Sequence, residues 1–117
     1  MMNRCLSTLI ALAAFGATSH ATAASGNLAA GKQKSEPCQA CHGADGNSTA
    51  AQYPRLAGQY ADYLAQALRE YQSGKRTNAI MNGFAKPLSE QDILDLAAYF
   101  SSLPGKLGDL HGHLQGD

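Results

Sequence analysis

The stretch Cys38-Gln39-Ala40-Cys41-His42 brings together two of the three cysteines of this 117-residue chain and one of its four histidines. A Cys-x-x-Cys pair can form a disulfide or supply half of a zinc site. When histidine follows directly, the pair can also attach a haem covalently. Each of these chemistries needs different partner residues elsewhere in the chain. The rest of the sequence therefore indicates which of the three is present.

The composition favours a single globular domain without a nucleic-acid partner. Apolar residues make up 44 % of the chain, and nine basic residues balance nine acidic ones. One domain is the usual expectation at this length, and nucleic-acid-binding domains usually carry a basic excess.

Residues 1–24 have the pattern of a secretory signal peptide. Arg4 precedes an apolar run over residues 6–17, and the small residues that follow suit cleavage after Ala23 or Ala24. The run is too short to span a bilayer well, although a retained membrane anchor is the alternative. We therefore predict export to the periplasm by a cleaved signal and no permanent membrane anchor.

The part of the chain that remains after cleavage divides into a domain and a tail. Residues 25–105 carry the helical patterns and the Cys-x-x-Cys-His stretch, and residues 106–117 form a polar, glycine-rich segment that we expect to be flexible. The exported domain then keeps only Cys38 and Cys41, because Cys5 lies within the signal.

The spacing of apolar residues predicts an all-α fold. A first helix opens near Asn27 and stops or kinks near Ser35, because Pro37 is tolerated at a helix start but not in a helix interior. Residues 43–52 are rich in turn-forming glycine, asparagine and aspartate and predict a loop.

Two longer helices are predicted towards the C-terminus. One spans about residues 59–73 and ends at Gly74, and the other starts at the N-cap Ser89 and ends before Pro104-Gly105. Residues 77–84, between them, are predicted to be a loop. Apolar and tyrosine side chains repeat at helical spacing along one face of the first of these helices: Leu56, Tyr60, Tyr63, Leu64, Ala67, Leu68 and Tyr71. The corresponding face of the second helix carries Ile93, Leu96, Ala97, Phe100 and Leu103, flanked by Tyr99.

Zinc and disulfide chemistry find little support. A structural zinc site needs four ligands, and the adjacent Cys41 and His42 cannot easily reach one tetrahedral ion together with Cys38; only His111 and His113 remain as further ligands. A redox Cys-x-x-Cys usually follows a strand in a βαβ pattern, and none is visible here. A plain structural disulfide beside an accidental histidine is the third alternative.

Covalent haem attachment is the chemistry that the sequence favours. On a helical turn Cys38 and Cys41 share a face, so both sulfurs can add to the vinyl groups of one haem while His42 reaches the iron. An exported chain agrees with this, because such attachment takes place after export.

The second axial ligand is predicted to be Met81. Met1 and Met2 leave with the signal, so Met81 is the only methionine of the exported domain. A thioether on haem iron raises its potential and fills the second axial position. His111 or His113 is the rival ligand.

With these residues placed, the chain resembles the class I cytochromes c. More narrowly, it is similar to one half of the bacterial periplasmic dihaem cytochromes c, or to their single-haem relatives. The matching stretches are Ala30-Gly31-Lys32, Cys38-Gln39-Ala40-Cys41-His42-Gly43, Asp45-Gly46-Asn47-Ser48, Tyr53-Pro54-Arg55-Leu56-Ala57-Gly58-Gln59, Met81, Pro87-Leu88-Ser89, Asp92-Ile93 and Leu96-Ala97-Ala98-Tyr99-Phe100.

The resemblance implies helices wrapped round one covalently bound haem c. It implies that the first and last helices cross where Ala30 or Gly31 lies close to Tyr99 or Phe100. It also implies that the Pro54 carbonyl accepts a hydrogen bond from the free ring nitrogen of His42. Two features depart from the pattern: there is one haem motif instead of two, and the polar stretch 34–36 with Pro37 replaces more apolar helix.

The expected function is that of a soluble monohaem carrier of single electrons, an electron-transfer protein and not an enzyme. Its expected partners are redox proteins that donate and accept electrons, such as a respiratory complex or a terminal oxidase or reductase. A haem subunit of a larger redox complex, and a ligand-binding sensor or peroxidase-like protein, are the alternatives.

Overall fold

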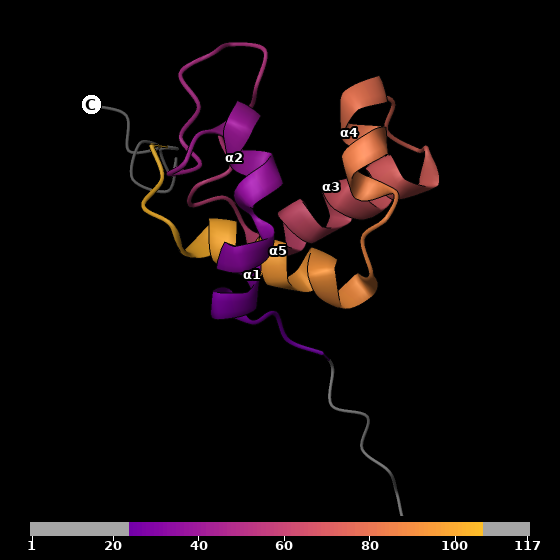
Figure 1. Cartoon of the computed structure of the whole chain (residues 1–117), viewed down its shortest axis with the longest axis horizontal. Coiled ribbons are helices and arrows are strands. Elements are labelled where there is room, and N and C mark those ends of the chain that lie inside the picture. Colours follow the sequence, from indigo (N-terminus) through magenta and orange to yellow (C-terminus); the bar gives the residue numbers. More distant parts are fainter. Residues whose placement is uncertain (1–23, 107–117) are drawn as a thin grey trace, which may run out of the picture.

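The structure is a computed structural model that describes residues 24–106, and these residues form five helices without a strand (Figure 1). The helices are α1 (Leu28–Lys34), α2 (Glu36–His42), α3 (Ala61–Ser73), α4 (Ala79–Ala85) and α5 (Glu90–Ser102). The predicted all-α fold is confirmed for this part of the chain. Residues 1–23 and 107–117 lie outside the described residues, and with them nearly all of the predicted signal and the rival ligands His111 and His113.

The break predicted near Ser35 separates α1 from α2. The Asn27 side chain caps α1 by accepting a hydrogen bond from the Ala30 N–H (2.9 Å). Ser35 is fully buried between the two helices, and its hydroxyl donates to the Lys32 carbonyl. Pro37 lies in the first turn of α2, where its missing N–H leaves no helical hydrogen bond unmade.

The two longer helices lie close to their predicted bounds. α3 begins two residues later than expected and ends at Gly74, whose φ of 78° is in the left-handed region that glycine adopts readily. α5 starts with a capping box, in which the Ser89 side chain accepts from the Asp92 N–H and the Asp92 side chain accepts from the Ser89 N–H.

The prediction of a loop around Met81 was wrong, because residues 79–85 form the short helix α4. Asparagine is common in turns, which favours a loop at Asn78. Its side-chain oxygen instead accepts from the N–H groups of Ile80 and Met81, which makes it the N-cap of a helix.

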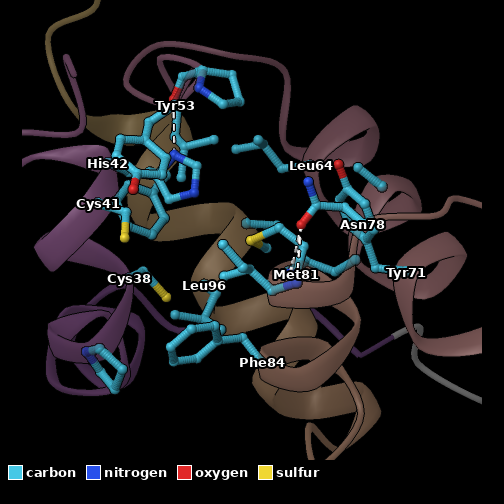
Figure 2. A pocket seen from close by; sticks show the side chains of 18 of the residues that line it. Cys38, Cys41, His42, Tyr53, Leu64, Tyr71, Asn78, Met81, Phe84 and Leu96 are labelled. Carbon is cyan, nitrogen blue, oxygen red and sulfur yellow. Dashed lines mark hydrogen bonds between the residues drawn. The ribbon is translucent and has the colours of Figure 1, made fainter. Parts of the chain in front are cut away.

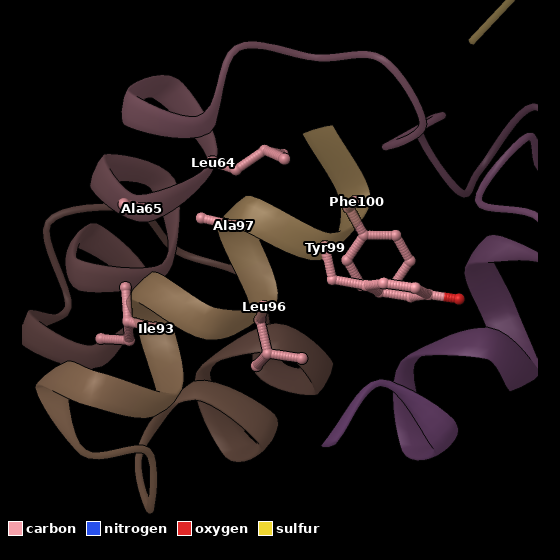
Figure 3. Packing of buried hydrophobic residues seen from close by; sticks show 7 residues of the cluster. All are labelled: Leu64, Ala65, Ile93, Leu96, Ala97, Tyr99 and Phe100. Atoms are coloured by element: carbon pink, nitrogen blue, oxygen red, sulfur yellow. The ribbon is translucent and has the colours of Figure 1, made fainter. Parts of the chain in front are cut away.

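The apolar core lies between α3 and α5 (Figure 3). Leu64 and Ala65 of α3 pack against side chains that α5 presents on one face: Ile93, Leu96, Ala97, Tyr99 and Phe100. The predicted face of α5 is therefore confirmed, whereas Ala65 was missing from the predicted stripe of α3.

α1 crosses α5 at Gly31. A β-carbon at Gly31 would lie 2.1 Å from the Asp95 carbonyl oxygen and 2.7 Å from the β-carbon of Tyr99. Only glycine lets the two backbones come this close. The crossing implied by the resemblance is therefore present, with Gly31 as the contact residue.

A buried carboxylate joins the N-terminal segment to α5. Asp95 is 2 % exposed and accepts hydrogen bonds from Lys34 Nζ (2.6 Å), the Asn27 N–H (2.7 Å) and Gln91 Nε2 (2.8 Å). Lys34 also pairs with Asp92 at 2.7 Å. The hydrogen bonds from Lys34, Asn27 and Gln91 lower the pKa of Asp95 to about 2.

Among residues 24–106, no helix has both the length and the apolar character needed to cross a membrane.

Candidate functional site

A pocket of about 790 Å³ opens between α2, the loop after it, α3, α4 and α5. Its volume is in the range of pockets that enclose small molecules and cofactors, about 300–1,000 Å³. Cys38, Cys41, His42 and Met81 all line it. Figure 2 shows the cysteines and His42 on one side and Met81 reaching in from α4 on the other.

His42 ends α2 and is held by the following loop. Its ring is 6 % exposed, and its Nδ1 lies 2.8 Å from the Pro54 carbonyl oxygen. A carbonyl can only accept, so Nδ1 carries the hydrogen of this contact, and Nε2 is the ring nitrogen left to bind a metal. The contact with Pro54 is the one that the resemblance implies.

The loop that carries Pro54 is fixed by backbone hydrogen bonds. The Ser48 N–H donates to the His42 carbonyl (3.0 Å), and the N–H groups of Leu56 and Ala57 donate to the Gly46 carbonyl (2.8 and 3.0 Å). The carbonyl that orients His42 is therefore held by a folded loop.

Cys38 and Cys41 are partly buried at the pocket wall and are not joined in a disulfide. Burial raises the pKa of the Cys38 thiol. Cysteines that exchange disulfides usually have a lowered pKa, which keeps them as thiolates. The surroundings of Cys38 therefore disfavour the redox alternative, as does the absence of a strand from the described residues.

The zinc alternative finds no ligand set within residues 24–106. No group of three or more histidine, cysteine, aspartate or glutamate side chains comes together there in a way that could hold a metal ion. A haem needs fewer protein ligands than zinc, because its porphyrin supplies four.

Met81 projects from the first turn of α4 into the pocket (Figure 2). Its N–H donates to the Asn78 side chain (3.0 Å). The residue that caps α4 therefore also holds the backbone of Met81. Sequence reasoning identified Met81 but missed Asn78 as the cap, although asparagine directly before an apolar pair is a known helix-start signal.

The walls of the pocket suit a large, flat and mostly apolar group. Apolar and aromatic side chains come from three parts of the chain: Leu56, Tyr63, Leu64, Ala67, Leu68 and Tyr71 before the turn at Gly74, Ile80 and Phe84 from α4, and Leu96, Ala97 and Phe100 from α5. Most of the predicted tyrosine and leucine stripe therefore forms cofactor wall as well as core. Tyr60 is 66 % exposed and is not part of the lining.

The charged side chains that line the pocket also suit a haem. Arg55 and Arg76 line the pocket, as does Lys34, whose charge is already paired with Asp92 and Asp95, and no described acidic residue lines it. A haem carries two carboxylates, which basic side chains complement. With paired thiols, an oriented histidine and a facing thioether, the residues fit haem c.

Comparison with known proteins points to the same cofactor. The family model described as Cytochrome c matches residues 28–104. A cytochrome c4 of Pseudomonas aeruginosa is 43 % identical over 107 residues, which cover 92 % of this chain and 52 % of that protein. Cytochrome c-554(548) of Halomonas halodenitrificans is 46 % identical over 80 residues, which cover 66 % of this chain and 96 % of that protein.

A redox enzyme's partner and a solved structure are also similar. The thiosulfate dehydrogenase electron acceptor of Thiomonas intermedia is 47 % identical over 81 % of this chain and 43 % of its own length. The crystal structure of reduced cytochrome c4 from Pseudomonas stutzeri superposes with a TM-score of 0.67 at 43 % identity, covering 72 % of this chain and 49 % of that one.

The chain thus spans about half the length of the curated cytochrome c4 proteins that it matches. The family match extends over nearly all the described residues and includes the Cys-x-x-Cys-His stretch. The helical fold is that of the class I cytochromes c, and the cofactor is haem c, bound covalently through the cysteine pair. The chain belongs to the cytochrome c family.

Proposed function

We propose that this chain is a one-electron carrier in which Cys38 and Cys41 hold the haem and His42 and Met81 bind its iron. The observation that carries the proposal is the meeting of these four side chains in one pocket, with His42 Nδ1 engaged by the Pro54 carbonyl. The bound haem supplies the change between ferrous and ferric iron.

The chain's own residues determine what that iron can do. His42 presents Nε2 because its other ring nitrogen is engaged, and Met81 would supply a second protein ligand in place of a small molecule. The apolar side chains of α3 and α5 that line the pocket would give the haem a largely apolar surrounding. Because His42 and Met81 would both bind the iron in either oxidation state, they favour electron transfer over ligand binding or catalysis.

The location and partners of the carrier are inferred from its sequence. The signal-like residues 1–24 favour the periplasm, where haem c is attached after export. Its partners would be redox proteins that donate or accept electrons, such as a respiratory complex or a terminal oxidase or reductase. Docking to them would be brief and salt-sensitive.

A role as the haem subunit of a larger redox complex is the second candidate. It is favoured by the similarity to proteins named thiosulfate dehydrogenase electron acceptor and cytochrome subunit of sulfide dehydrogenase. Purification from native membranes and soluble extract separates the two, because a subunit would co-purify with a stoichiometric dehydrogenase and a free carrier would not.

A haem count with a redox titration tests the carrier proposal. The matured protein should hold one haem per chain, retain it through denaturing electrophoresis, and titrate reversibly as a single one-electron couple. A protein without haem, or a haem lost on denaturation, would contradict covalent attachment through Cys38 and Cys41.

A further inference from the structure

α4, which carries Met81, contributes no side chain to the apolar core between α3 and α5. Ala85 is its only buried residue, and Ile80 and Phe84 line the haem pocket instead. The helix has seven residues, too few to be stable by itself. Something other than core packing must therefore fix its position against the rest of the molecule.

Asn82, the residue after Met81, supplies one attachment. Its side-chain Nδ2 donates to the carbonyls of Tyr71, in the last turn of α3, and Arg76, in the following turn (2.5 and 3.0 Å). Its Oδ1 accepts from the N–H of Asn78, the N-cap of α4 (2.8 Å). One partly buried amide thus joins the end of α3, the turn and the start of α4.

Gln72, on α3, supplies a second attachment at the other end of α4. Its Nε2 donates to the carbonyls of Ala85 and Leu88 (3.3 and 2.7 Å). These two carbonyls lie where α4 ends and the chain turns towards α5. The two amides therefore hold both ends of α4 against α3. Figure 1 shows the two helices next to each other.

We propose that Asn82 and Gln72 are positioning residues that hold Met81 in place as an iron ligand. They act through the backbone of α4 and set how readily the thioether leaves and another ligand enters. The inference depends on the proposed role of Met81, and Met81→Ala tests that role separately.

Asn82→Asp is the sharpest variant because it is nearly isosteric. The carboxylate still accepts from the Asn78 N–H but can no longer donate to the Tyr71 and Arg76 carbonyls. Gln72→Ala is the second variant. Its side chain is exposed, so the substitution is compatible with folding.

Imidazole is the probe. Its affinity for the ferric holoprotein is measured by absorption, together with the methionine–iron charge-transfer band. We expect imidazole to bind roughly tenfold more tightly to Asn82→Asp, and about threefold more tightly to Gln72→Ala, the scale of one or two lost hydrogen bonds. Met81→Ala defines the fully open site, with no charge-transfer band.

Asn47→Asp is the matched control. Asn47 also donates through Nδ2 to a distant carbonyl, that of Pro104 (2.9 Å), and accepts through Oδ1 from the Lys106 N–H (3.0 Å). It does so in the loop that follows His42. This variant should lower the free energy of unfolding, as Asn82→Asp does, and leave the imidazole affinity unchanged.

The outcomes separate the possible failures. Imidazole affinity that is unchanged in Asn82→Asp and Gln72→Ala but raised in Met81→Ala would overturn the positioning role and leave Met81 as the ligand. An equal rise in Asn47→Asp would also overturn it, by showing general loosening. An unchanged affinity and charge-transfer band in Met81→Ala would instead overturn the proposed ligand.

Discussion

The two proposed iron ligands reach the pocket from supports of different kinds. His42 is almost fully buried, lies next to one of the two cysteine anchors, and is oriented by a loop that backbone hydrogen bonds hold in place. Met81 lies on a short helix with one buried residue, which side-chain amides attach to α3. The histidine side is fixed by covalent structure and burial, and the methionine side by a few hydrogen bonds.

This difference assigns different tasks to the two sides. Disturbing the histidine side should affect haem retention and folding, because the core and the cofactor meet there. Disturbing the methionine side should alter the potential and the access of small ligands while the fold persists. The predictions that follow test this division, from the largest expected effect to the smallest.

The largest effect is expected from removing the covalent anchors. Cys38→Ala combined with Cys41→Ala should yield a chain without bound haem and with poor cooperativity of unfolding, because a domain this small has a core completed by its cofactor. Circular dichroism during thermal unfolding measures this. A cooperative, fully helical apoprotein would show that the histidine side does not depend on the haem.

Met81→Ala should act on the other side alone. Loss of the thioether should lower the reduction potential and let carbon monoxide bind the ferrous form, with the helical content kept. Potentiometry and absorption spectra test this. An unchanged potential would shift attention to His111 and His113 as the second ligand.

Helix boundaries and the cofactor were predictable from local signals. Pro37 predicted the break between α1 and α2, Ser89 the start of α5, and Cys38, Cys41 and His42 the chemistry of the site. These signals lie within a few residues of what they determine, so a single sequence reveals them.

The features that were not predicted depend on contacts between distant residues. Asp95 lies on the buried side of α5, where a charged residue is not expected, because its carboxylate is matched by Lys34, which is 61 positions away in the sequence. The start of α4 has a local signal in Asn78, but the amide contacts of Asn82 and Gln72 that hold α4 against α3 leave no mark on the local sequence pattern. The methionine side was therefore the harder one to predict.

Gly31→Ala should destabilise the crossing of α1 and α5, which lies on the histidine side of the molecule. The new methyl group would lie 2.1 Å from the Asp95 carbonyl oxygen, so α1 and α5 would have to move apart. We expect a loss of about 1–3 kcal/mol in the free energy of unfolding, the usual cost of overpacking. Denaturant unfolding of the holoprotein measures it, and the charge-transfer band should be retained. Loss of the band would show that the two sides are not independent.

Asp95→Asn should give the smallest effect and a defined pH dependence. The folded pKa of Asp95, about 2, lies below its ordinary value of 3.8, so the charged form stabilises the fold. This stabilisation is fully present above pH 3.8 and is lost as pH falls towards 2. The stability difference between the parent protein and Asp95→Asn should therefore be constant from neutral pH to about 4 and shrink below it. A difference that persists at the lowest pH would rule out the ion pair as its source.

The most direct test of the central claim, that His42 and Met81 together bind the haem iron, is the absorption spectrum of the holoprotein at neutral pH, with and without carbon monoxide. We predict a methionine–iron charge-transfer band in the ferric form and a ferrous spectrum that carbon monoxide leaves unchanged. A ferric form without this band, together with ready binding of carbon monoxide, would contradict the account and favour a ligand-binding haem protein.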